Sequence, residues 1–199
     1  MDKIKVIEKL ISCYKKLPSV GYKTAERLAY STLDLKSEEI DSFIENLEEA
    51  KNIKRCDRCG IYIEDSCPLC NDEKRDKKTI LVVSSPRDVY SIEKSGVYNG
   101  LYFTLNGTLS AVHNRDSHST KIDELFKKIE EEKIEELILV LDSTLDGEMT
   151  CSYIINHLSS CNIKISKIAH GIPLGTSLEY LDEMTINLSI KGRQVVKEK

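Results

Sequence analysis

The chain has 199 residues, of which 40% are hydrophobic and 31% are charged, and its formal net charge is -4. This length suffices for one ordinary core with one or two small modules, and the composition excludes a largely disordered chain. The longest apolar run, Leu137–Leu141, is too short to cross a bilayer, so we expect a soluble intracellular protein that does not bind membranes.

The charges are distributed unevenly along the first 60 residues. Residues 1–31 contain seven Lys or Arg against three Asp or Glu, residues 34–49 are strongly acidic, and residues 51–58 are basic again. An acidic partner such as DNA could contact the basic segments, although ordinary solvated faces explain either segment alone.

The first 50 residues predict three helices. Apolar residues at helical spacing predict an amphipathic helix over residues 3–16, which Pro18 ends. A short turn follows and leads into a second helix, and a third is expected to begin with Ser37 as its N-cap.

The turn at residues 17–21, Leu-Pro-Ser-Val-Gly, resembles the helix-hairpin-helix motif of non-specific DNA-binding proteins. Unpaired N–H groups and the helix dipole favour a phosphate at the start of the second helix, where Lys23 and Arg27 add positive charge one turn apart. Ser19 stands where the usual hairpin has its first glycine, so Gly21 is expected to supply the unrestricted φ. An ordinary helical hairpin is the alternative.

Four cysteines in two CxxC pairs, separated by seven residues, predict one structural zinc site. The ligands would be Cys56, Cys59, Cys67 and Cys70. A disulfide pair, a redox CxxC motif and coincidence are the alternatives, but no secretory segment precedes the cysteines and a redox motif normally occurs once. Four protein ligands leave no open position on the metal, so we expect one Zn²⁺ per chain that stabilises the fold.

The remaining cysteines, Cys13, Cys151 and Cys161, show no mutual pattern and are interpreted as reduced core residues. The charged segment 72–78 is interpreted as a linker or exposed turn.

From residue 79 the pattern alternates between strands and helices. Strands are expected at 80–83, 101–105, 137–141 and 163–168, with helices between them, one beginning at Ser85-Pro86 and ending at Gly96 and another over 149–159. Such alternation predicts a parallel, doubly wound sheet that binds ligands at the carboxyl ends of its strands. Residues 106–120 are interpreted as a mobile loop, and His170 as a hydrogen-bonding loop residue.

The expected strand ends carry Ser84 and the acidic residues Asp142, Asp146 and Glu148. A sheet of this kind resembles the Toprim domain, in which a glutamate and an Asp-x-Asp pair hold magnesium for phosphoryl transfer. This chain has Ser84 at the glutamate position and Thr144 in place of the second aspartate. We therefore expect these acids to bind a basic partner or magnesium weakly, or to serve as ordinary helix N-terminal residues.

Taken together, the motifs resemble the bacterial RecR recombination mediators over essentially the whole chain. The hairpin, the four-cysteine knuckle, Pro86-Arg87-Asp88-Val89, Thr144-x-x-Gly147-Glu148 and the segment Gly171–Thr185 occur in the family's order. The resemblance implies an α/β multidomain fold: a helix-hairpin-helix domain (1–53), a four-cysteine zinc finger (54–78), a Toprim domain (79–170) and a C-terminal oligomerisation or tail segment (171–199).

The resemblance also implies a function. RecR-like clamps act without enzymatic activity, with RecO and in some settings RecF, to load RecA on gapped or single-stranded DNA during repair. It further implies a homodimer or ring-like homotetramer and a cytoplasmic, nucleoid-associated location. Our hypothesis is that Lys15, Lys16, Lys23 and Arg27 contact phosphate. A magnesium-dependent Toprim nuclease or primase-like enzyme, and a zinc-stabilised adaptor that binds only protein, are the alternatives.

Overall fold

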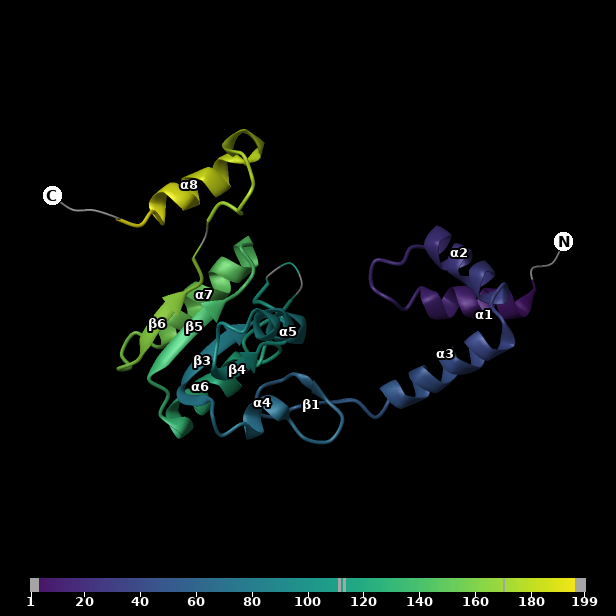
Figure 1. The fold of residues 1–199 in the computed structure, drawn as a ribbon, viewed down its shortest axis with the longest axis horizontal. Helices are drawn as coiled ribbons and strands as arrows, with labels where there is room; N and C mark the ends of the chain where they lie inside the picture. Colours follow the sequence, from purple (N-terminus) through teal and green to yellow (C-terminus); the bar gives the residue numbers. More distant parts are fainter. Residues whose placement is uncertain (1–3, 111, 113, 170, 196–199) are drawn as a thin grey trace. The chain divides into compact units, whose positions relative to one another are not determined.

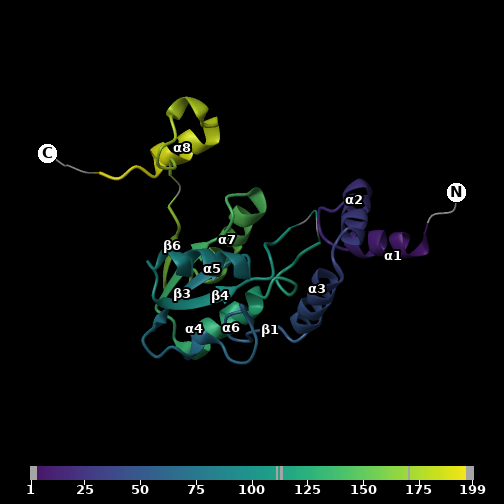
Figure 2. The ribbon, with the colours of Figure 1, turned by 45° about the vertical axis from the view of Figure 1, so that its right-hand side comes forward.

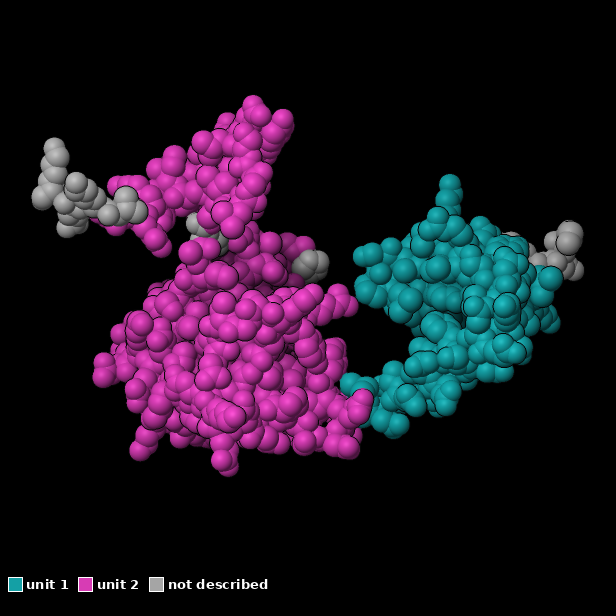
Figure 3. All heavy atoms as spheres, viewed as in Figure 1, with its two compact units in different colours: residues 1–53 teal, residues 54–199 magenta. Residues whose placement is uncertain are grey.

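The computed structural model describes residues 4–110, 112, 114–169 and 171–195. The chain divides into two compact units, residues 1–53 and residues 54–199 (Figure 3). Within the described ranges, no helix combines the length and the apolar character that a membrane span requires.

The first unit consists of three helices, α1 (Lys5–Tyr14), α2 (Tyr22–Leu33) and α3 (Ser37–Ala50) (Figure 1). Its small core comes from α1 and α2 and consists of Ile7, Ile11, Ala25 and Ala29. The two alanines are fully buried, which lets the two helices pack closely. The three predicted helices are confirmed, with α3 beginning one residue early because Lys36, rather than Ser37, is its N-cap.

Helix α3 buries none of its residues. Phe43, Ile44 and Leu47 are each at least half exposed, although their spacing places them on one face of the helix. They line an apolar groove of about 390 Å³ together with Leu10 and Leu17. The first unit therefore exposes a continuous apolar surface.

The second unit begins with the knuckle, which contains the short antiparallel strands β1 (Lys54–Arg55) and β2 (Tyr62–Ile63) and the single-turn helix α4 (Pro68–Asn71). Its four cysteines are buried in the same apolar cluster as Leu81, Val83 and Tyr102 of the sheet. Thr104 N–H also donates a hydrogen bond to the Cys59 carbonyl at 2.9 Å. The knuckle is therefore packed onto the sheet.

The sheet contains β3 (Asp76–Val83), β4 (Gly100–Thr104), β5 (Glu136–Val140) and β6 (Lys164–Lys167), all parallel, in the order β4-β3-β5-β6. Helices α6 (Ile122–Glu132) and α7 (Leu145–His157) pack against one face, and α5 (Pro86–Ser95) and the knuckle against the other (Figures 1 and 2). The predicted parallel sheet flanked by helices is confirmed.

Several local predictions were wrong. Residues 76–78 belong to β3, and Arg75 is only 9% exposed, so segment 72–78 is not simply an exposed linker. Cys13 and Cys161 are exposed, whereas Cys151 is buried as expected. Helix α7 begins at Leu145 because the Thr144 side chain caps it by accepting a hydrogen bond from Gly147 N–H.

The C-terminal segment contains a single 3₁₀ turn (Leu178–Tyr180) and helix α8 (Glu183–Lys191), where the sequence predicted a loop and tail. In the loop after β4, an isolated bridge joins Ser110 and Arg115. Residues 111 and 113 of the expected mobile loop, and His170, lie outside the described residues.

Candidate nucleic-acid interface and metal centre

The hairpin between α1 and α2 places basic side chains on both sides of one turn. Lys15 is the C-cap of α1 and Lys16 follows it, while Lys23 and Arg27 lie one turn apart on α2. All four are exposed, and within the described ranges none of them belongs to a recorded ion pair. Their positive charge is therefore available to an anionic ligand.

The start of α2 has the features of an anion site. Its N-cap is Gly21, and no side chain caps the first turn. The first turn lies at the positive end of the helix dipole, which favours a negatively charged ligand. The phosphate contact expected for the hairpin stays a prediction.

The backbone freedom of the hairpin comes from a residue other than the one predicted. Gly21 has φ -76°, an ordinary value, whereas Ser19 has φ +63° in the left-handed region. The turn therefore requires a positive φ at position 19, where the usual motif has glycine.

The four knuckle cysteines converge on one point. Their Sγ atoms all lie within 4.8 Å of one another, with 3.8 Å between Cys56 and Cys70 and 3.5 Å between Cys59 and Cys67. A tetrahedral zinc with Zn–S bonds of about 2.3 Å separates its sulfurs by about 3.8 Å, whereas a disulfide brings them to about 2.05 Å. The geometry fits a metal and does not fit disulfides.

The electrostatics of the cluster also favour a cation. Hydrogen bonds from Cys59 and the other cysteines, with the nearby Arg58 charge, lower the pKa of Cys70 to about 5, although burial opposes this shift. The pKa of Cys59 is raised, first by its hydrogen bond to Cys70 and then by burial. Closely spaced thiols that hydrogen-bond to one another lose their protons when Zn²⁺ binds, and the ion is then held by the thiolates.

The acidic residues at the carboxyl end of β5 do not converge in this way. In the described parts of the chain, the four cysteines are the only group of three or more His, Cys, Asp or Glu residues close enough to share an ion. Glu148 forms an ion pair with Lys167, whose Nζ lies 2.7 Å from Oε2. Asp142 is exposed before α7, and Asp146 lies in the first turn of that helix.

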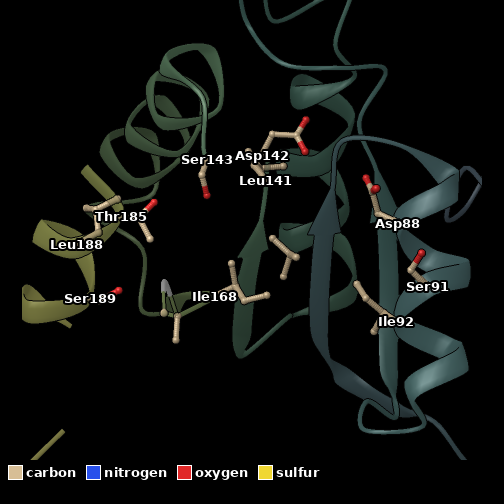
Figure 4. A pocket seen from close by; sticks show the side chains of 13 residues that line it. Asp88, Ser91, Ile92, Leu141, Asp142, Ser143, Ile168, Thr185, Leu188 and Ser189 are labelled. Carbon is tan, nitrogen blue, oxygen red and sulfur yellow. The ribbon is translucent and has the colours of Figure 1, made fainter. Parts of the chain in front are cut away.

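Asp142 instead contributes to a pocket of about 530 Å³ that also contains Asp88 of α5 (Figure 4). Figure 4 shows the two carboxylates beside the end of the sheet, with Thr185, Leu188 and Ser189 of α8 on another side of the pocket. Burial, together with the negative charge of Asp142, raises the pKa of Asp88, although a hydrogen bond from Ser85 N–H opposes this shift.

One polar network was not predicted from the sequence. The buried guanidinium of Arg75 forms an ion pair with Glu93 of α5 and donates a hydrogen bond to the Gly100 carbonyl at 3.0 Å. Glu93 in turn accepts a hydrogen bond of 2.6 Å from Tyr102. This network connects the end of the knuckle segment to α5 and β4. The sequence gives no local signal for it, because Arg75 and Glu93 are 18 residues apart.

The hairpin, the cysteine cluster and the parallel sheet together define a multidomain α/β protein with a helix-hairpin-helix motif, a zinc-finger-like cluster and a Toprim domain. Comparison with known families agrees with this class. Residues 7–51 match the family described as RecR, helix-hairpin-helix, residues 78–169 match the Toprim domain, and residues 171–194 match RecR, C-terminal.

Curated relatives match nearly the full length of the chain. "Recombination protein RecR" of Lacticaseibacillus casei (strain BL23) is 40% identical over 190 residues, which cover 94% of this chain and 96% of the relative. The protein of the same name from Ligilactobacillus salivarius (strain UCC118) is 39% identical over 193 residues, which cover 96% and 97% of the two chains. The chain therefore belongs to the RecR family, and this membership supports a role in recombinational DNA repair.

Proposed function

We propose that this chain is a non-enzymatic recombination mediator that holds DNA and acts with RecO, and with RecF in some settings, to load RecA on gapped or single-stranded DNA. The observation that carries the DNA-binding part is the group of exposed basic residues, Lys23 and Arg27 among them, at the positive end of the α2 dipole. With Lys15 and Lys16, these residues form a phosphate-binding surface that reads no base sequence. The proposed location is the cytoplasm, at the nucleoid.

We further propose that Cys56, Cys59, Cys67 and Cys70 bind one structural Zn²⁺ per chain, which the sulfur separations support. The metal would supply folding stability, because four thiolates leave no position for a substrate. The division of the chain into 1–53, 54–78, 79–170 and 171–199 is a proposal as well, with the second and third parts sharing one core.

The proposed assembly is a homodimer or a ring-like homotetramer. The apolar groove along α3 supports self-association, because an exposed apolar face of this kind is usually covered by another molecule. In a ring, several subunits contact the same DNA at once, so a few weak phosphate contacts per subunit add up. This gain in overall affinity offsets the repulsion expected from the net charge of -4.

For the acidic residues we propose contact with a basic partner such as RecO, through Asp142, Asp146 and Glu148. The magnesium-dependent enzyme is less well supported, since Lys167 neutralises Glu148 and Ser84 stands at the glutamate position. A magnesium-dependent nicking or primer-synthesis assay separates the two functions: activity that is lost on Glu148→Gln would overturn the mediator proposal.

DNA retention by the full chain tests the hairpin. We expect Lys23→Ala combined with Arg27→Ala to weaken binding equally for oligonucleotides of unrelated sequence, and to reduce the slope of log K against log salt by about 1 to 2. The control replaces Lys94 and Lys127, exposed lysines of α5 and α6, by alanine and removes the same charge. Unchanged retention in the hairpin variant, or an equal loss in the control, would contradict the assignment.

A further inference from the structure

A second pocket at the carboxyl end of β3 has the opposite charge character to the one beside Asp88 and Asp142. It has a volume of about 530 Å³ and is lined by residues of three segments: β1, the turn from β3 into α5, and the loop after β4. Its polar lining residues are Arg55, Ser84, Ser85 and Asn106. No carboxylate lines it.

Arg55 is exposed but held in one orientation. Its Nη1 donates a hydrogen bond to Asn106 Oδ1 at 2.6 Å and its Nη2 donates one to the Tyr62 hydroxyl at 3.3 Å. The guanidinium also lies over the Tyr62 ring, 5.1 Å from its centroid. A guanidinium has five N–H donors, so these contacts orient Arg55 without exhausting its capacity to donate.

A second guanidinium, that of Arg115, lies beside Gly107, one of the residues that line this pocket. A Cβ added to the lining residue Gly107 would lie 2.5 Å from Arg115 Nη1, so the absence of a side chain permits this approach. The glycine has φ +101°, a value that other residues rarely adopt. The Nε of Arg115 and the Oγ of Ser84 are both buried, and neither has a hydrogen-bond partner in the described structure.

We propose that this pocket binds a phosphate group through Arg55, Arg115 and Ser84. Two guanidinium groups and a hydroxyl, with no carboxylate lining the pocket, match the charge and the acceptor geometry of an oxyanion and repel a metal cation. The alternative interpretation is that Arg55 has only a structural role and joins the knuckle to the loop after β4. A structural role explains the contact of Arg55 with Asn106. It does not explain why Arg115 Nε and Ser84 Oγ are buried without a hydrogen-bond partner in the described structure.

The phosphate source that the surroundings favour is a DNA backbone rather than a free nucleotide. A bound base normally needs an aromatic face, and Tyr62, the aromatic residue that contacts Arg55, already carries the guanidinium over its ring. A backbone phosphate needs only the charged donors. The inference rests on the proposed DNA binding and adds a contact in the second unit, separate from the hairpin.

The test uses the full-length protein and two variants. Arg55→Ala removes one donor, and Ser84→Glu places a carboxylate among the donors without removing either arginine. We expect Arg55→Ala to weaken DNA retention about 3- to 10-fold near physiological salt and to lower the salt slope by about 1. Ser84→Glu should weaken retention at least as much, while Lys127→Ala removes an equal charge outside the pocket and should have little effect. Zinc content and melting temperature verify that each variant is folded.

A second measurement addresses the site directly. In an amide NMR titration of the wild type, inorganic phosphate should shift the resonances of Ser84, Ser85 and Gly107, and Ser84→Glu should abolish these shifts. Absence of the shifts in the wild type, or full DNA retention by both variants while the hairpin variant loses it, would overturn the site and leave the proposed function intact. Thymidine monophosphate that binds here as tightly as an oligonucleotide would identify a nucleotide site and overturn the DNA assignment. If the wild-type protein does not retain DNA at all, the proposed function itself is refuted.

Discussion

At the scale of single residues, Ser19 shows how the hairpin departs from an ideal motif. Its φ of +63° lies in a region where the Cβ of an L-residue is crowded by the following carbonyl. Gly21, which has the permissive backbone, does not use it. The hairpin therefore keeps its positive-φ turn, and the unfavourable backbone conformation falls on Ser19.

Ser19→Gly should stabilise the first unit. Relief of about 1–2 kcal/mol of left-handed strain is partly offset by the greater freedom of glycine in the unfolded chain, which leaves a net gain of about 0.5–1 kcal/mol. Chemical denaturation of the full chain, followed by circular dichroism, measures it. The same substitution at Ser31, exposed within α2, should instead cost about 0.5 kcal/mol. A destabilised Ser19→Gly protein would show that the turn does not need glycine.

At the scale of elements, the knuckle stabilises more than itself. Its cysteines share an apolar cluster with Leu81, Val83 and Tyr102, and the Cys59 carbonyl accepts the hydrogen bond of Thr104 N–H. Gly60 is essential to this contact, because a Cβ there would lie 2.9 Å from the Cβ of Thr104 and its φ is +82°. If the cysteines hold the proposed Zn²⁺, its removal should loosen the adjoining edge of the sheet.

Hydrogen exchange tests this coupling. Chelation, or Cys67→Ser, should release one zinc per chain and accelerate exchange of the Thr104 amide at least about tenfold, which corresponds to about 1.4 kcal/mol of lost local stability. Amides of β5, at the centre of the sheet, should respond less. Cys161→Ser, at an exposed cysteine outside the cluster, serves as the control. Unchanged Thr104 protection after the zinc has been removed would contradict the coupling.

The elements that the sequence predicted correctly are those with strong local signals. Ser85, Pro86 and Gly96 delimit α5 as expected, because a capping serine, a proline at N1 and a left-handed glycine act within a few residues. The polar start of β3 was not recognised as strand at residues 76–79, because backbone pairing at the end of the sheet does not require an apolar side chain. Helix α8 had only one signal, the Asp182 side chain that caps Thr185 N–H.

The candidate sites divide in the same way. Cysteine spacing alone indicated the candidate metal ligands, because all four lie within 15 residues. Arg55 and Arg75 interact with Asn106 and Glu93, which lie far along the chain. Arg115 lies beside Gly107 of the same loop. No local pattern distinguishes such residues from ordinary charged surface, so only the folded chain identifies them.

At the scale of the whole molecule, the exposed apolar face of α3 has the strongest consequence. Phe43 is 50% exposed and Leu47 55%, yet both line one groove with residues of α1. Leaving this surface in water is unfavourable by roughly 25 cal/mol per Å². We therefore expect the groove to be covered in solution by a second copy of the chain.

Phe43→Glu should shift the assembly to a smaller species, because a carboxylate in an apolar interface is not solvated. Light scattering after size exclusion, at several protein concentrations, measures the mass. The control is Val97→Glu, which introduces the same charge at an apolar side chain that is 84% exposed in the second unit. An unchanged mass for Phe43→Glu would mean that copies associate through another surface.

The two edge strands of the sheet, β6 and β4, are protected from further strand pairing in different ways. The edge strand β6 carries Lys164 and Lys167, which pair with Glu136 and Glu148, and charged side chains in an edge strand discourage an incoming strand. β4 has no such charges, and every one of its residues is buried, partly under the knuckle. Arg75 and Tyr98 donate hydrogen bonds to the carbonyls of Gly100 and Leu101, and the knuckle pairs with Thr104 N–H. If zinc starvation unfolds the knuckle, we expect the Thr104 end of β4 to become available to strands of other molecules, which promotes fibrous aggregation.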